Sequence, residues 1–300
     1  MMPGTLTGER SPALDLGLAP VVVAVARGGS DAAVRFGAEE AHRTGRPLDL
    51  VHVALPGDGW NRLLGRDSLQ VAAERARTFA GDSVVIETEL LRGDALLELP
   101  RAARACALLV MERRHPADRR RPEASTTIAV ADALNAPSVV VPAGWQEGHR
   151  RVVTVGLDAG AADHRAVRSA LAQARLRGAA LRVLVAESPT GPDAVRALRD
   201  RVDELLSRLG GDACDLSVEL LAEPAGPALL HAAATSDLVV IGRHQPTIQS
   251  GSRLGPVARE VVREAACPVL LTRPAHAHAP SPAQPRRKEL SCTRDQETAS

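Results

Sequence analysis

Short runs of β-branched and aliphatic residues alternate along this chain with longer amphipathic segments. The runs Val21–Val25 and Val152–Leu157 are of the kind expected for strands buried on both faces of a sheet. A turn of small residues and an alanine-rich helical pattern follow each run, which predicts helices at about 31–44 and 163–177. A glycine comes directly after each helical pattern, at the position where helices commonly end.

The pattern of the first half returns in the second half at an offset of 130 to 133 residues. Four further strands are predicted in each half, at 48–53, 89–91, 107–111 and 138–142, and at 181–186, 219–221, 237–241 and 268–272. Strands that alternate with helices predict a parallel sheet with helices on both faces. The predicted fold class is therefore α/β, with two tandem units that each contain a five-stranded, mostly parallel sheet.

The same pattern predicts where the units begin and where a ligand would bind. We place the first unit at 19–146 and the second at 149–274, between a disordered lead-in at 1–18 and a disordered, proline-containing tail at 275–300. Right-handed crossovers require the strand order to reverse within each sheet. The crevice beyond the carboxyl ends of the strands at that reversal is the expected ligand site.

Composition excludes several classes of protein. Basic and acidic residues nearly balance, 37 against 36, which argues against a nucleic-acid partner. Only 1% of residues are aromatic, so stacking platforms for single strands are missing. The longest apolar runs are five or six residues, far below the ~20 that span a bilayer, so we expect no membrane partner. Four cysteines without metal-site or redox spacing indicate a reducing, cytoplasmic location and no metal site.

Several segments of the second half resemble the universal stress protein family, and the first half resembles it more weakly. ATP-binding members of that family carry a motif of the form G-x2-G-x9-G-[S/T]. Its glycines allow backbone N–H groups to approach phosphate, and the following helix N-terminus favours an anion. The segments that carry the resemblance are Val152–Asp158, Ala174–Gly178, Asp237–Gly242 and Leu254–Leu271. The resemblance implies the Rossmann-like fold of that family.

In the second half the spacing of this motif is kept, but only part of its residues. Gly242 and Gly255 stand at the first and third glycine positions, whereas Gln245 replaces the middle glycine and Pro256 the hydroxyl residue. Asp158 matches the acid that contacts adenosine in the family. The resemblance thus implies an ATP or related adenine-nucleotide site, with added positive charge from Arg243, His244 and Arg253. The candidate binding residues are Leu157, Asp158, Gly242, Arg243, His244, Gly255, Pro256 and Val257.

In the first half the spacing is also kept, but the glycines are replaced. Glu112, His115, Ser125 and Thr126 stand at the motif positions, and Ala26 replaces the adenosine-contacting acid. A carboxylate at the first position would repel a triphosphate at a cost of a few kcal/mol, on the order of 2–4 at partial burial. We therefore expect no nucleotide in the first unit. Five arginines between 113 and 121 form a solvated loop or, alternatively, a clamp for an anionic partner.

These observations favour a binding protein over an enzyme. No nucleophile, base and orienting acid come together in the sequence, so any ATP hydrolysis would be slow. The leading hypothesis is a tandem, cytosolic stress-response module with ATP binding in the second unit. The alternatives are a scaffold that has lost nucleotide binding and an adenylyl-transferring ligase. The family resemblance also implies that the two units pair through strands 139–141 and 269–271, with homodimerisation as a further option.

Overall fold

The computed structural model describes residues 18–57, 59–113, 123–158, 164–186, 191–210, 214–243 and 252–272. The first unit contains β1 (Val21–Ala24), α1 (Asp31–Thr44), β2 (Leu48–Ala54), α2 (Gly59–Ala80), β3 (Ile86–Arg92), α3 (Ala95–Ala102), β4 (Leu108–Arg113), α4 (Glu123–Ala133) and β5 (Ser138–Pro142). The second unit contains β6 (Val152–Asp158), α5 (His164–Arg177), β7 (Ala180–Ala186), α6 (Pro192–Arg208), β8 (Leu216–Leu220), α7 (Ala225–Ala233), β9 (Leu238–Ile241), α8 (Pro256–Glu264) and β10 (Val269–Leu271).

The ten strands form one continuous sheet in the order β3-β2-β1-β4-β5-β10-β9-β6-β7-β8. Within each unit all neighbouring strands are parallel, and the order reverses at the first strand, between β1 and β4 and between β6 and β9. The two units meet where β5 and β10 run antiparallel, with Val140 opposite Val269. The predicted fold class is confirmed, and the strands expected to join the units do pair.

The local signals act as the sequence indicates. Helix α1 ends at Gly45, whose φ of 63° is a left-handed conformation that glycine adopts without a Cβ clash. Gly178 ends α5 in the same way, with a φ of 57°. The predicted disordered lead-in at 1–18, apart from Leu18, and the predicted disordered tail at 275–300 lie outside the described part of the chain.

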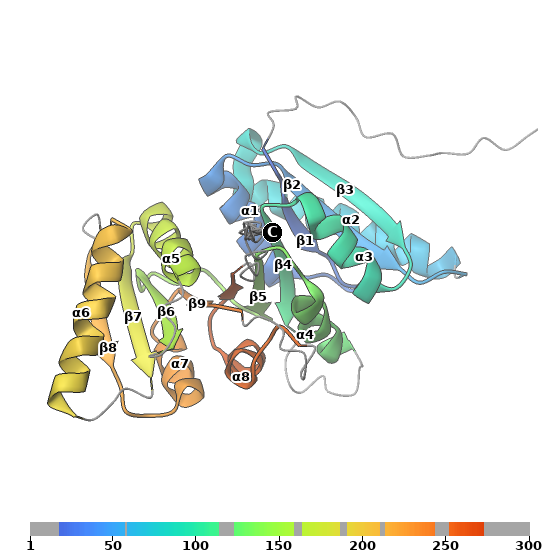
Figure 1. The fold of residues 1–300 in the computed structure, drawn as a ribbon. Helices are drawn as coiled ribbons and strands as arrows, with labels where there is room; N and C mark the ends of the chain where they lie inside the picture. The colour runs from blue at the N-terminus through green and yellow to red at the C-terminus, as the bar shows by residue number, and fades with distance from the viewer. Residues whose placement is uncertain are drawn as a thin grey trace, which may run out of the picture.

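Two hydrophobic layers cover the sheet, one on each face. Residues of α1, α2, α5 and α6 form the first layer with the strands, and Phe36 and Leu171 are among its fully buried side chains. Residues of α3, α4, α7 and α8 form the second layer, around Val130 and Val261. In Figure 1 α5 therefore lies next to α1, and α8 next to α4, where the units meet. No helix in the described ranges is long and apolar enough to cross a membrane.

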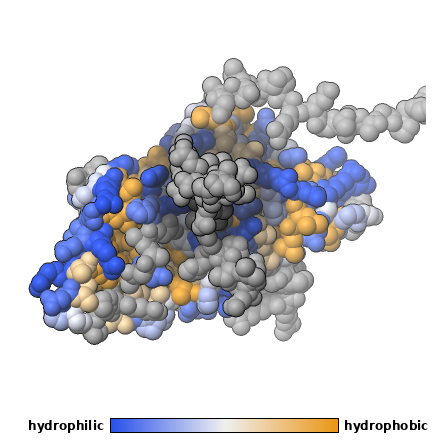
Figure 2. Space-filling view, in the orientation of Figure 1, coloured by the Kyte–Doolittle hydropathy of each residue, from blue (hydrophilic) through white to orange (hydrophobic). Residues whose placement is uncertain are grey.

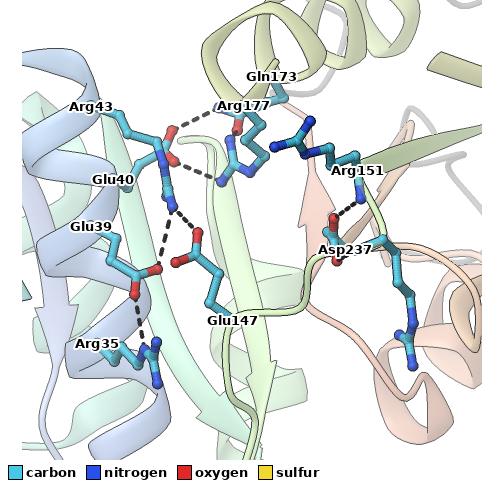
Figure 3. A network of polar contacts seen from close by, with 10 residues as sticks. Arg35, Glu39, Glu40, Arg43, Glu147, Arg151, Gln173, Arg177 and Asp237 are labelled. Atoms are coloured by element: carbon cyan, nitrogen blue, oxygen red, sulfur yellow. Dashed lines mark hydrogen bonds and ion pairs between the residues drawn. The ribbon is translucent and has the colours of Figure 1, made fainter. Parts of the chain in front are cut away.

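Polar and aromatic contacts join α1 to α5 across this junction (Figure 3). The buried carboxylate of Glu40 pairs with Arg177 at 2.8 Å and accepts a hydrogen bond of 2.7 Å from the amide of Gln173. The Arg177 guanidinium also lies over the ring of Phe36, 5.6 Å from its centre, and Phe36 contacts Trp145 of the linker edge to face. A buried charge is tolerated only when it is paired, so these contacts fix how the two units sit.

Candidate functional site

The candidate site of the second unit lies at the carboxyl ends of β6 and β9. These parallel neighbours pair Gly156 with Ile241, so Asp158 and Gly242 reach the same edge of the sheet. The side chain of Leu157 is buried and that of Asp158 is exposed at this edge. The structure therefore brings Leu157, Asp158 and Gly242 to the same edge of the sheet, at the point where the strand order reverses.

The other candidate residues open helix α8. Gly255 is its N-terminal cap, and Pro256 occupies the first turn, where a missing N–H removes no helical hydrogen bond. Val257 follows within that turn. His244 lies outside the described residues, together with the rest of the loop at 244–251, so its predicted role is not tested.

The expectation that Arg243 places positive charge near phosphates is corrected by the structure. Its side chain is only 5% exposed and points across the junction into the first unit. Nη1 donates to the Leu134 carbonyl and Nη2 to the Ser138 hydroxyl, each at 2.5 Å. Burial, assisted by nearby Arg253, lowers the pKa of Arg243 to about 10. The guanidinium is therefore hydrogen-bonded to the end of α4 and the start of β5.

Arg113 makes the reciprocal contact from the first unit. It stands 130 positions before Arg243, and its Nη1 and Nη2 donate to the carbonyls of Val262 and Ala265 at 3.0 and 2.7 Å. Burial lowers the pKa of Arg113, and Glu264 and Cys267 partly oppose that shift. Each arginine thus satisfies carbonyl groups at the C-terminal end of the other unit's last helix, where a cation is favoured. We call Arg113 and Arg243 the arginine clamps.

The segment that opens α8 is also held by the first unit. One carboxylate oxygen of Asp132, on α4, accepts hydrogen bonds from the backbone N–H groups of Arg253 and Leu254 at 2.8 Å and from the hydroxyl of Ser252 at 3.0 Å. The Arg253 guanidinium donates to the Ala133 carbonyl at 3.0 Å, so this second predicted phosphate contact is also directed at the junction. Sequence reasoning missed Asp132, because nothing marks a single acid on a helix as an anchor.

In the first unit the corresponding crevice is a cavity of about 390 Å³. Glu112 stands where the second unit has Gly242, and its Oε2 accepts hydrogen bonds from the N–H groups of Ala32 and Ala33 at 2.9 and 3.2 Å. Those N–H groups belong to the N-terminus of α1, which is where an anion would otherwise bind. The residue predicted to repel phosphate therefore also occupies an anion-binding position.

His52 forms part of the wall of this cavity. Its ring is buried, and Nδ1 donates to the Val25 carbonyl at 2.7 Å. Helix α2 packs closely over the ring at Gly65, because a Cβ there would come within 2.6 Å of His52 Cδ2. His52 is therefore a packed core residue. Within the described ranges no group of three or more His, Cys, Asp or Glu residues could hold a metal ion.

The fold defines a class: a two-unit α/β protein in which the strand order reverses once in each unit. The sequence model of the Universal stress protein family matches residues 149–273. A universal stress protein from Mycolicibacterium smegmatis is 29% identical over 274 residues, covering 82% of this chain and 93% of that protein. The second unit thus matches the Universal stress protein family, and the chain as a whole is similar to a universal stress protein.

Solved structures agree on the fold. A universal stress protein from Archaeoglobus fulgidus has a TM-score of 0.66 at 13% identity and covers 85% of this chain and 98% of its own. A Pseudomonas aeruginosa structure has a TM-score of 0.64 at 18% identity and covers 86% of this chain and 94% of its own. Both comparisons extend over the two units, so the fold of the whole described chain is shared with these structures.

Proposed function

We propose that this protein is a cytoplasmic stress-response binding module whose second unit binds an adenine nucleotide, with ATP as the leading candidate. The nucleotide would lie at the strand-end crevice between Asp158, Gly242 and the N-terminus of α8. The protein would act by binding, with at most slow ATP hydrolysis. Its two units would form a pseudo-dimer within one chain.

The contrast between Gly242 and Glu112 carries this proposal. Both residues directly follow the last buried residue of the fourth strand in their units. In the first unit the side chain at this position places a carboxylate on the amides of α1. In the second unit the position has no side chain, and the exposed Asp158 stands on the neighbouring strand. A glycine at this position leaves backbone without a Cβ, which would allow a phosphate group to approach it closely.

Titration of the full chain with ATP, followed by calorimetry, tests the proposal. We expect saturable binding by the natural protein. Gly242→Glu gives the second unit the carboxylate of the first and should weaken binding by at least about tenfold, which corresponds to 1.4 kcal/mol. Gly242→Ala is the matched control for the added side chain without the charge and should weaken binding less. The absence of saturable binding to the natural protein at millimolar ATP would reject the proposal.

A second candidate function is a scaffold that no longer binds nucleotide. The contacts of Arg243 and Arg253 favour it, because both side chains are engaged with the first unit instead of the crevice. The arginine-rich loop at 113–121 that would serve such a scaffold lies, apart from Arg113, outside the described residues. Chromatography of nucleotide released from freshly purified protein distinguishes the two functions. Co-purified ATP would rule out a scaffold that has lost nucleotide binding.

A further inference from the structure

We propose that the cavity of the first unit is a separate binding site, and that it takes an aromatic heterocycle without phosphate or carboxylate groups. The site lies at the carboxyl ends of β1, β2 and β4 and is distinct from the nucleotide crevice proposed for the second unit. The inference does not depend on that crevice being occupied. It rests on the volume, the walls and the charge of the cavity.

The volume and walls suit a small organic molecule. A cavity of about 390 Å³ falls within the range of roughly 300–1,000 Å³ that is typical of small-molecule sites. Most of its wall is aliphatic, and the lining includes Val25, Val53, Leu55, Leu96, Leu99 and Met111.

Apolar side chains also reach the surface where the cavity opens. Leu55 is 63% exposed, and Leu96 on α3 is 39% exposed. Figure 2 shows a hydrophobic patch in the region where Figure 1 places α2 and α3. A planar, weakly polar molecule would cover these surfaces and release the water that they now order.

The charge of the lining selects against anions. Two carboxylates, Asp94 and Glu112, face a single guanidinium, Arg27, among the described lining residues. Arg27 Nη1 donates to the Asn61 side-chain oxygen at 3.4 Å. The two α1 amides that would attract a phosphate already bind Glu112. A phosphate in the cavity would meet a like charge where a helix would otherwise stabilise it.

The polar groups that remain favour a ligand with hydrogen-bond donors. The carboxylate of Asp94 caps α3 by accepting from the Leu96 N–H at 2.9 Å, and a carboxylate has room for further donors. A ring with an amine substituent could donate to such oxygens while its faces lie against the aliphatic wall. The ligand class is therefore an uncharged or cationic amino-heterocycle.

The sequence provides a selective probe of this cavity. Met111 lines it, and the other two methionines are the first two residues of the chain. In full-length protein labelled with ¹³C at the methionine methyl groups, the Met111 resonance therefore reports on the first unit alone. The experiment uses the Gly242→Glu background, in which nucleotide binding by the second unit is weakened.

Adenosine and AMP form the matched pair of probes, because they differ only in the phosphate. We expect adenosine to shift the Met111 resonance in a saturable way and AMP to bind at least about tenfold more weakly. Glu112→Gln keeps an acceptor oxygen for the α1 amides but removes the charge. It should therefore reduce the difference in affinity between adenosine and AMP. Glu74→Gln, on the exposed face of α2, is the control and should leave the difference unchanged.

Two results would overturn the proposal. One is a Met111 resonance that adenosine does not move at millimolar concentration. The other is equal binding of adenosine and AMP by protein that carries the natural Glu112, a comparison that holds even if the Glu112→Gln variant fails to fold. Calorimetric ATP binding to the natural protein is a separate readout, so this site and the second-unit site can fail independently.

Discussion

A single residue distinguishes the crevices of the two units. Gly242 has no side chain at the end of β9, whereas the carboxylate of Glu112 accepts hydrogen bonds from the N-terminus of α1. The repulsion between Glu112 and phosphate could be predicted from the sequence, because charge and position in the repeat suffice for it. The hydrogen bonds to Ala32 and Ala33 could not, since they join residues about 80 positions apart.

A buried thiol gives the protein a specific response to alkaline pH. Cys267 is 1% exposed, and burial raises the pKa of its thiol from 9.0 to about 12. The folded state therefore keeps a proton that the unfolded state loses above pH 9, so stability is complete below that pH and falls as the pH rises towards 12. At pH 10.5 the loss should be about 2 kcal/mol.

Urea unfolding between pH 8 and 10.5 measures this effect. The chain has no tyrosine and a single lysine, Lys288, so few other groups titrate in this range. Arg243, whose pKa is lowered to about 10, does titrate there and opposes the decline, because the unfolded state then binds more protons than the folded state. Cys267→Ala should flatten the decline in stability, while Cys214→Ala, at a half-buried position, should preserve it. A decline of equal slope in the natural protein and in Cys267→Ala would show that other groups are responsible.

At the scale of elements, the strands and helix ends follow local rules that the sequence carries. Runs of aliphatic residues place β1 and β6, and Gly45 and Gly178 end the helices that follow them. The direction of long side chains at the junction cannot be predicted from local sequence in this way. Arg243 was expected to face the phosphates beside its neighbour Gly242, but a guanidinium reaches far from its backbone and here finds acceptors 109 and 105 residues away.

The arginine clamps should stabilise the last helices of the two units. Arg243→Ala leaves the Leu134 carbonyl and the Ser138 hydroxyl without their donor, which should cost about 1–3 kcal/mol in the free energy of unfolding. Arg243→Lys should recover only part of that loss, because an ammonium group cannot reproduce the planar fork that spans two acceptors.

Hydrogen exchange localises the same effect. In Arg243→Ala we expect faster exchange at the C-terminal end of α4, and in Arg113→Ala at that of α8, where the contacts to Val262 and Ala265 are lost. Arg208→Ala is the control, since its ion pair on α6 is exposed. Unchanged exchange at both helix ends, together with unchanged stability, would mean that the clamps contribute nothing.

At the scale of the whole molecule, the tandem units form one sheet but differ in the residues at their equivalent strand ends. Several contacts join the two units: the β5–β10 pair, the arginine clamps, the hydrogen bonds of Asp132 and the Glu40–Arg177 ion pair. Elements near the candidate site of each unit therefore also contact the other unit. The repeat in the sequence predicts two similar units and their shared fold. It does not predict how firmly the loop before α8 is tied to the first unit, because that depends on a contact between residues about 120 positions apart.

The number of adenine nucleotides bound per chain tests the central claim most directly. Equilibrium dialysis of the natural protein against labelled ATP should give one site per chain, in the second unit, and Gly242→Glu should weaken binding at that site by at least about tenfold. Two equivalent sites, no site, or a single site whose affinity Gly242→Glu leaves unchanged would contradict the account.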